Sequence, residues 1–286
     1  MKKLLLLSCI AGVSALAMAH TFWMAPQKFF FTIREVANIR LWAGTDLAAE
    51  KSSSSPASVQ YLYHHLPSGN IVNIAPLMNG AGADSFRLPL GDEGTHMLVC
   101  NSTVPMTTYT ADSFNTYLQA NGLEHVLAYR AANHETQQGS TALLQYNTKT
   151  ILQVGAKITD ACIHPSALPL DIIPEENPYI VPLGTDRTRP VRLRFQVLFS
   201  YEPLGDVLVK MQYRDAGNRL LTDSARTNKR GWVTLTRHPG PCLISCVYMT
   251  RSDAGSAARW HGYTASLSFE YSQFFPGKSG IYTREH

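Results

Sequence analysis

The sequence predicts a mostly β protein built from two β-sandwich domains, with a short helical excursion in the first. Segments rich in β-branched and aromatic residues recur along the chain, and Gly- and Pro-containing turn sequences separate them. The stretch from Val191 to Val197 alternates apolar and polar residues, and Phe199 continues its apolar face. Short strands at this spacing are typical of sandwiches, in which each strand buries one face.

The first 19 residues have the three parts of a secretory signal peptide. Met1-Lys2-Lys3 is the basic start, an apolar run follows from Leu4, and Ala17-Met18-Ala19 supplies small residues for cleavage. Cleavage after Ala19 would give a periplasmic chain of 286 − 19 = 267 residues that begins with His20. The formal net charge would fall from +4 to +2, because Lys2 and Lys3 are removed. We therefore expect no nucleic-acid partner and no membrane span in the mature chain.

The first domain is expected to span residues 20–184. Phe114, Tyr117 and Leu118 have helical spacing, so residues 112–119 are predicted to form a helix that stops at Asn121-Gly122. Residues 163–190 contain six prolines and are expected to form an extended connector, with the domain boundary near residue 185. The predicted strands of this domain are residues 29–33, 37–42, 58–65, 94–100 and 149–155.

The second domain is expected to span residues 185–286. Its first strand places apolar side chains on one face and Arg192, Arg194 and Gln196 on the other. A strand at residues 207–213 follows, and Asp215-Ala216-Gly217-Asn218 predicts a hairpin turn after it. The last strand is predicted from Tyr263 to Glu270, with alternate residues buried.

Four cysteines remain after cleavage, and an even number in an oxidising compartment permits disulfides. Cys242 and Cys246 lie on one predicted strand, about 13 Å apart, which is too far for them to bridge each other. Cys100–Cys162 is one candidate pair. Three connectivities are possible, and the sequence leaves the choice between them open.

A chain that begins with His20 would carry two metal ligands on one residue, the α-amine and the ring Nδ1. Together they can chelate Ni, Co or Cu, the metals that imidazole suits. Either His96, beside a turn in the same domain, or His261, just before the last strand, is expected to complete the site. His64 and His65 are adjacent in a predicted strand, so only one of these two rings could join. The alternative for each internal histidine is a surface or hydrogen-bonded core role without metal.

Six stretches spread over the chain match one known family: His20 to Pro26, Phe114 to Leu118, Asn121 to Leu123, Tyr146 to Gly155, Asn177 to Tyr179 and Tyr263 to Glu270. Together they resemble the exported bacterial domain-of-unknown-function family 4198, described as a periplasmic component of nickel/cobalt uptake. At Met24-Ala25-Pro26 the chain departs from the family, which often has an acidic residue before the proline. The second domain is similar to prealbumin-like sandwiches, with turns at Glu202-Pro203-Leu204-Gly205 and Arg230-Gly231. The resemblance implies a metal-binding protein whose partner is an inner-membrane metal transporter.

The sequence contains no Gly-x-Ser-x-Gly elbow, no His-Glu-x-x-His helix and no phosphate-binding glycine loop. No catalytic residue is therefore predicted. The expected function is binding of Ni, Co or Cu for uptake or delivery, anchored by His20. Two alternatives remain, a metal-free β-sandwich module that binds proteins or glycans and a copper-dependent redox enzyme.

Overall fold

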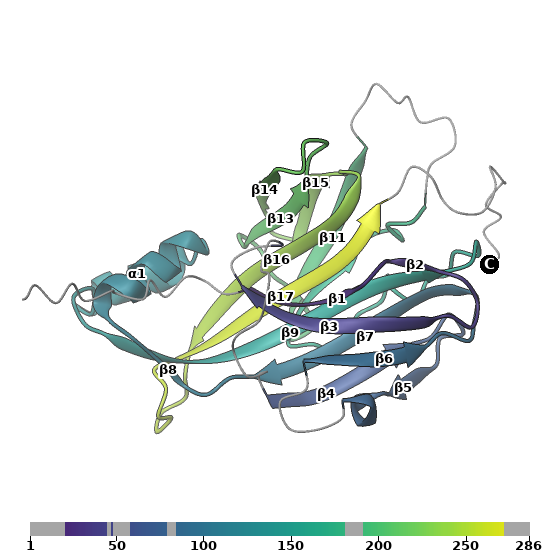
Figure 1. Cartoon of the computed structure of the whole chain (residues 1–286). Coiled ribbons are helices and arrows are strands. Elements are labelled where there is room, and N and C mark those ends of the chain that lie inside the picture. Colours follow the sequence, from purple (N-terminus) through teal and green to yellow (C-terminus); the bar gives the residue numbers. More distant parts are fainter. Residues whose placement is uncertain (1–20, 45–46, 48–57, 79–83, 181–190, 272–286) are drawn as a thin grey trace, which may run out of the picture.

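The computed structural model describes residues 21–44, 47, 58–78, 84–180 and 191–271. The predicted signal peptide, His20 and the proposed boundary near residue 185 lie outside these residues. The described strands form three sheets stacked in layers, and the helices lie beside one end of them (Figure 1). The prediction of a mostly β fold with sandwich packing is therefore confirmed.

A central sheet of ten strands runs through the molecule in the order β14-β13-β16-β17-β9-β7-β4-β5, and β2 and β8 add to β9. Strands β17 and β9 are parallel, so strands from both predicted domains share this sheet. The strand bounds are β14 Leu220–Arg226, β13 Leu208–Arg214, β16 Gly240–Arg251, β17 Trp260–Tyr271, β9 Ser140–Val154, β7 Gly94–Thr103, β4 Ser58–His65, β5 Ile71–Asn73, β2 Phe30–Phe31 and β8 Thr107–Tyr109.

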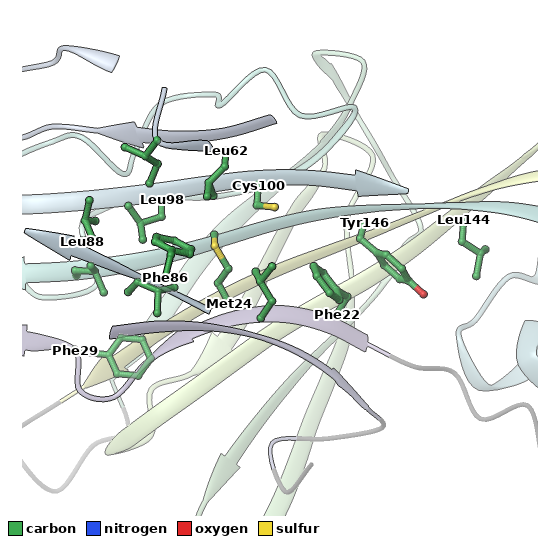
Figure 2. Packing of buried hydrophobic residues seen from close by; sticks show 14 of the residues in the cluster. Phe22, Met24, Phe29, Leu62, Phe86, Leu88, Leu98, Cys100, Leu144 and Tyr146 are labelled. Carbon is green, nitrogen blue, oxygen red and sulfur yellow. The ribbon is translucent and has the colours of Figure 1, made fainter. Parts of the chain in front are cut away.

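The N-terminal sheet covers one face of the central sheet and consists of β1 (Thr21–Pro26), β3 (Val36–Gly44) and β6 (Ser85–Pro89). Strands β1 and β3 run across β9 and β7 in Figure 1. The hydroxyls of Thr148 and Ser266 donate to the Phe22 carbonyl at 2.9 and 2.7 Å, which fixes β1 on the central sheet. Figure 2 shows the core between these layers, which includes Phe22, Met24, Phe86, Leu98, Cys100 and Tyr146.

The C-terminal sheet covers the opposite face and consists of β10 (Leu170–Pro174), β11 (Arg192–Phe199), β12 (Glu202–Pro203) and β15 (Trp232–Thr236). Leu193, Phe195 and Val197 of β11 are buried here, as their alternation predicts. Strand β7 serves both cores, because Leu98 and Cys100 face one and Met97 and Val99 face the other. The fold is therefore two sandwiches that share one central sheet.

Helices α1 (Ala111–Ala120) and α2 (Glu124–Ala132) lie between β8 and β9. The Thr110 hydroxyl accepts a hydrogen bond from the Ser113 amide and caps α1. Phe114, Tyr117 and Leu118 are buried as predicted. Helix α2 follows Gly122, whose φ of 63° turns the chain. No helix in the described part of the chain is long and apolar enough to cross a membrane.

The proline-rich stretch from residue 163 to 190 is not an irregular connector throughout, which corrects the prediction. Leu170–Pro174 forms β10 and pairs antiparallel with β11. Pro174 stands at the last position of the strand, where the loss of one amide donor is tolerated. Leu170 and Ile172 are buried in the second core, so their burial supports the strand despite the nearby prolines.

Candidate functional site

A groove of about 870 Å³ opens between the N-terminal sheet and the ends of β16 and β17. Ala25, Arg40 and Arg87 line it from β1, β3 and β6. Ser268 and Glu270 line it from β17. On β3 and β6 the lining residues alternate with buried apolar ones, so the regular strand period points them away from the first core. Strands therefore position these polar and charged lining residues, while Gln27, Lys28, Phe29 and Leu47 line the groove from outside the strands.

Two tryptophans give the groove an aromatic wall. Trp23 of β1 and Trp42 of β3 are direct cross-strand partners, and their rings stack 6.4 Å apart at an angle of 14°. Trp23 is only 2% exposed, whereas Trp42 remains partly open. The Arg40 guanidinium lies over the Trp42 ring, 5.3 Å from its centroid. Together they form a flat surface that is apolar and also carries positive charge.

Positive charge outweighs negative charge in the described lining of the groove. Lys28, Arg40 and Arg87 contribute three cations, and Glu270 contributes one carboxylate. Lys28 is neutralised by Glu35 at 2.5 Å, and this contact lowers the pKa of the Glu35 carboxyl. Burial raises the pKa of the Glu270 carboxyl. The two arginines are exposed, and no described carboxylate pairs with either.

His96, one of the predicted metal ligands, forms a buried pair with His64. The Nε2 of His64 lies 2.8 Å from the Nδ1 of His96, and the Nε2 of His96 lies 3.0 Å from the Asp92 carbonyl oxygen. A carbonyl only accepts, so His96 donates through Nε2 and accepts at Nδ1 from His64. Burial lowers the pKa of His64 to about 3 and also lowers that of His96. The two rings are therefore a neutral core pair, and His65 points to the other face as predicted.

His261 lies far from His96 in the same sheet. Its Nδ1 is 3.0 Å from the Tyr263 hydroxyl, and the two rings stack. On β9 the partner of His261 is Leu143 and that of His96 is Leu152, 152 − 143 = 9 positions apart. At about 3.3 Å per residue this separation is roughly 30 Å, so one ion cannot bind both histidines.

The start of β1 is also distant from His96. Phe22 lies beside Thr148, four positions from Leu152 on β9, or roughly 13 Å. The described residues contain no cluster of three or more His, Cys, Asp or Glu side chains that could hold a metal. A shared centre of His96 and His261 therefore does not fit the structure. His20 lies outside the described residues, and its chelate stays a prediction.

All four described cysteines are free and buried. Cys100 faces the first core and Cys162 the second, so the central sheet lies between them. This arrangement excludes the Cys100–Cys162 pair that the sequence left open. Burial raises the pKa of both thiols to about 12, so neither is a reactive thiolate near neutral pH.

The groove residues were not among the predicted site residues. The segment from Ala37 to Trp42 contained the signal, because Asn38, Arg40 and Trp42 alternate with three apolar residues. An arginine and a tryptophan on the same exposed face indicate a binding surface. The opposite wall could not be inferred, because Glu270 follows Trp42 by more than 200 positions and reaches it only through the stacking of two sheets.

A family model described as "Domain of unknown function (DUF4198)" matches residues 17–250. No curated protein matches the chain. Among solved structures, the D0-D1 domain of Intimin is 14% identical, with a TM-score of 0.21, and the match covers 87% of this chain and 97% of that one. A DUF3823 family protein from Bacteroides uniformis is 10% identical, with a TM-score of 0.22, and the match covers 88% and 99%. Similarities this distant carry no inference about function.

Proposed function

Because the chain belongs to the DUF4198 family of domains of unknown function, we propose a function from its groove: an extracytoplasmic module that binds acidic glycans. The observation that carries the proposal is that the exposed arginines Arg40 and Arg87 line the same groove, with Arg40 over the Trp42 ring. This function corresponds to the binding-module alternative of the sequence analysis. It does not depend on a metal.

The chemistry of the lining supports a sugar acid as ligand. The apolar face of a pyranose ring can lie on the Trp42 surface, as apolar ligand faces do on aromatic side chains. A guanidinium binds a carboxylate through two parallel hydrogen bonds, so Arg40 and Arg87 suit uronic acid groups. Asn38, directly opposite Arg87 in the β3–β6 register, offers an amide to sugar hydroxyls.

Titration calorimetry with oligogalacturonate and with its neutral methyl ester tests this function. The acid is expected to bind and the ester to bind at least about tenfold more weakly, because the ester cannot form charge-assisted hydrogen bonds. Arg87→Gln should weaken binding of the acid by a similar factor and leave binding of the ester unchanged.

Arg192→Gln is the matched control, because Arg192 is an exposed arginine on β11 of the other sheet. It should bind the acid like the unmodified protein. Equal affinity for acid and ester, or an Arg87→Gln variant that still binds the acid fully, would refute the acidic-glycan function.

A second candidate is Ni, Co or Cu binding by residue 20, in a periplasmic protein that delivers the ion to an inner-membrane transporter. Strand β1 begins at Thr21, and Phe22, Trp23 and Met24 are buried. Cleavage before residue 20 would therefore attach the α-amine and the imidazole to a fixed strand. The observation that favours this candidate is the burial of Phe22, Trp23 and Met24 in the strand that begins at Thr21.

Metal titration of the processed protein tests the chelate. Tight binding is expected only when His20 is the first residue, and one extra residue before it should abolish that binding. His96→Gln should leave the affinity unchanged, because His96 is committed to His64 and Asp92. Equal affinity with the extra residue present would eliminate the chelate.

A further inference from the structure

A lysine and an aspartate meet in the second core, between the central and C-terminal sheets. Lys149 of β9 and Asp171 of β10 form an ion pair whose side chains are only 1% and 3% exposed. In the central sheet Lys149 is flanked by Val99 of β7 and Leu267 of β17, both fully buried. Charges in such apolar surroundings are costly, and a simple ion pair recovers only part of that cost.

The two carboxylate oxygens of Asp171 have different surroundings. The Oδ2 atom accepts hydrogen bonds from the Ser166 amide and from the Ser166 hydroxyl, each at 2.8 Å. The Oδ1 atom contacts the Lys149 Nζ, yet neither atom makes a hydrogen bond to any described residue. The Ser166 donors thus fix Oδ2, while the Lys149 Nζ contacts Oδ1 of the same carboxyl group.

The turn that carries Ser166 is itself held in an unusual conformation. Ala167 has a φ of 61°, in the left-handed region that non-glycine residues rarely adopt. The Tyr61 hydroxyl of β4 donates to the Ala167 carbonyl at 3.4 Å. Strained backbone of this kind persists only where the surroundings enforce it. The surroundings therefore keep the Ser166 donors directed at Asp171.

We propose that Lys149 and Asp171 condense into an intramolecular amide cross-link between β9 and β10. The ammonium first returns a proton to the carboxylate, which gives a neutral amine and a carboxylic acid. The Nζ lone pair then forms a bond to Cγ, the Cγ–Oδ1 bond breaks, and Oδ1 leaves as water with the proton already transferred and one further proton from Nζ. The ammonium and carboxylate together contain every atom of the amide and the water, so no co-reactant is needed.

Three features of the site favour this reaction. Both side chains are buried, so water that would hydrolyse the product is excluded from the site. The two Ser166 donors stabilise the negative charge that develops on Oδ2 during attack, as an oxyanion hole does. The folded sheets hold amine and carboxyl in contact, which removes the entropic cost of bringing them together. The product replaces two buried charges with one neutral amide.

Intact-mass measurement of the reduced, denatured full-length mature protein tests the cross-link. The mass is expected to be lower than the sequence mass by one water, after the N-terminus has been established from the same sample. Tryptic digestion should yield one branched peptide that contains both Lys149 and Asp171. Lys28 and Glu35 form an exposed ion pair in the same chain and should appear only in linear peptides.

Lys149→Arg is the matched variant, because it keeps the cation but has no primary amine. Its mass should equal the sequence mass. The peptide map of the unmodified protein decides the question even if this variant fails to fold. A full sequence mass, with Lys149 and Asp171 found only in separate linear peptides, would overturn the proposal and leave a simple buried ion pair.

Discussion

At the scale of single residues, burial decides what each histidine can do. His64 is 4% exposed and His96 is fully buried, and one hydrogen bond joins the Nε2 of His64 to the Nδ1 of His96. The adjacent His65 lies on the other face of the same strand, and burial lowers its pKa as well. His64 and His96 therefore occupy core positions rather than a ligand-binding site. Their burial makes the stability of the folded protein depend on pH.

We expect the free energy of unfolding to fall as the pH is lowered from 6.5 towards 3. Burial lowers the pKa of His64 from its ordinary value of 6.5 to about 3 in the folded state, so the unfolded chain binds more protons between these values. Above pH 6.5 the neutral His64 ring does not reduce the free energy of unfolding. At pH 5 protonation of His64 in the unfolded chain lowers that free energy by about 2 kcal/mol. Urea unfolding of His64→Gln across this range should show a correspondingly flatter profile.

His164→Gln provides the comparison, because His164 is exposed and its replacement should leave the pH profile unchanged. If His64→Gln keeps the full slope between pH 7 and pH 5, His64 is not the residue responsible. The test is independent of ligand binding, because His64 does not line the groove.

At the scale of secondary-structure elements, Arg130 joins the two helices to the turn before β9. It is fully buried, and its guanidinium donates to the Asn115 side chain of α1 and to the carbonyls of Thr136 and Gln138. The same group lies 4.9 Å from the Phe114 ring centroid. Helix α2 buries little else apart from Val126, so this polar contact is a main attachment of the helix pair.

Arg130→Met is expected to lower the free energy of unfolding by about 3 kcal/mol. The change removes the hydrogen bonds that the guanidinium donates to Asn115, Thr136 and Gln138, together with its contact with the Phe114 ring. Urea denaturation followed by circular dichroism measures this loss. Arg192→Met, at an exposed position on β11, should change stability by no more than about 0.5 kcal/mol. Equal stabilities of the two variants would show that Arg130 does not hold the helices.

At the scale of the whole molecule, the central sheet determines how far the two predicted domains depend on each other. Strand β17 pairs with β9 from Trp260 to Ser268, and the two cores lie on opposite faces of this sheet. Met97, Val99 and Ile151 come from the first predicted domain but are buried against the second. Removing either half would therefore expose a broad apolar face and an unpaired strand edge.

Residues 20–184 and 185–286 are expected not to fold when produced separately. Each fragment should be protease-sensitive and lack a cooperative thermal transition, whereas the full mature chain should show one. Limited proteolysis and calorimetry make the comparison. A cooperative transition in the fragment 185–286 alone would establish it as an independent sandwich domain and support the predicted boundary.

Local pattern in the sequence determined the elements whose signal lies within one segment. The helix at Phe114, Tyr117 and Leu118 and the strand β11 were predicted because their apolar residues recur at the period of each structure. The strand at Ser58–His65 was predicted from its β-forming residues and the turn that follows it. Helix α2 was missed because few of its residues are buried, and β10 because prolines obscured it. The fold class therefore followed from the sequence alone.

Only the tertiary structure decided which residues meet. Trp23 and Trp42, His64 and His96, and Lys149 and Asp171 are separated along the chain and come together through strand register or the stacking of sheets. Period and composition give the face on which a side chain lies, but not which strand lies opposite it. That choice depends on the burial of apolar surface across all three layers at once, which no single segment of the sequence contains.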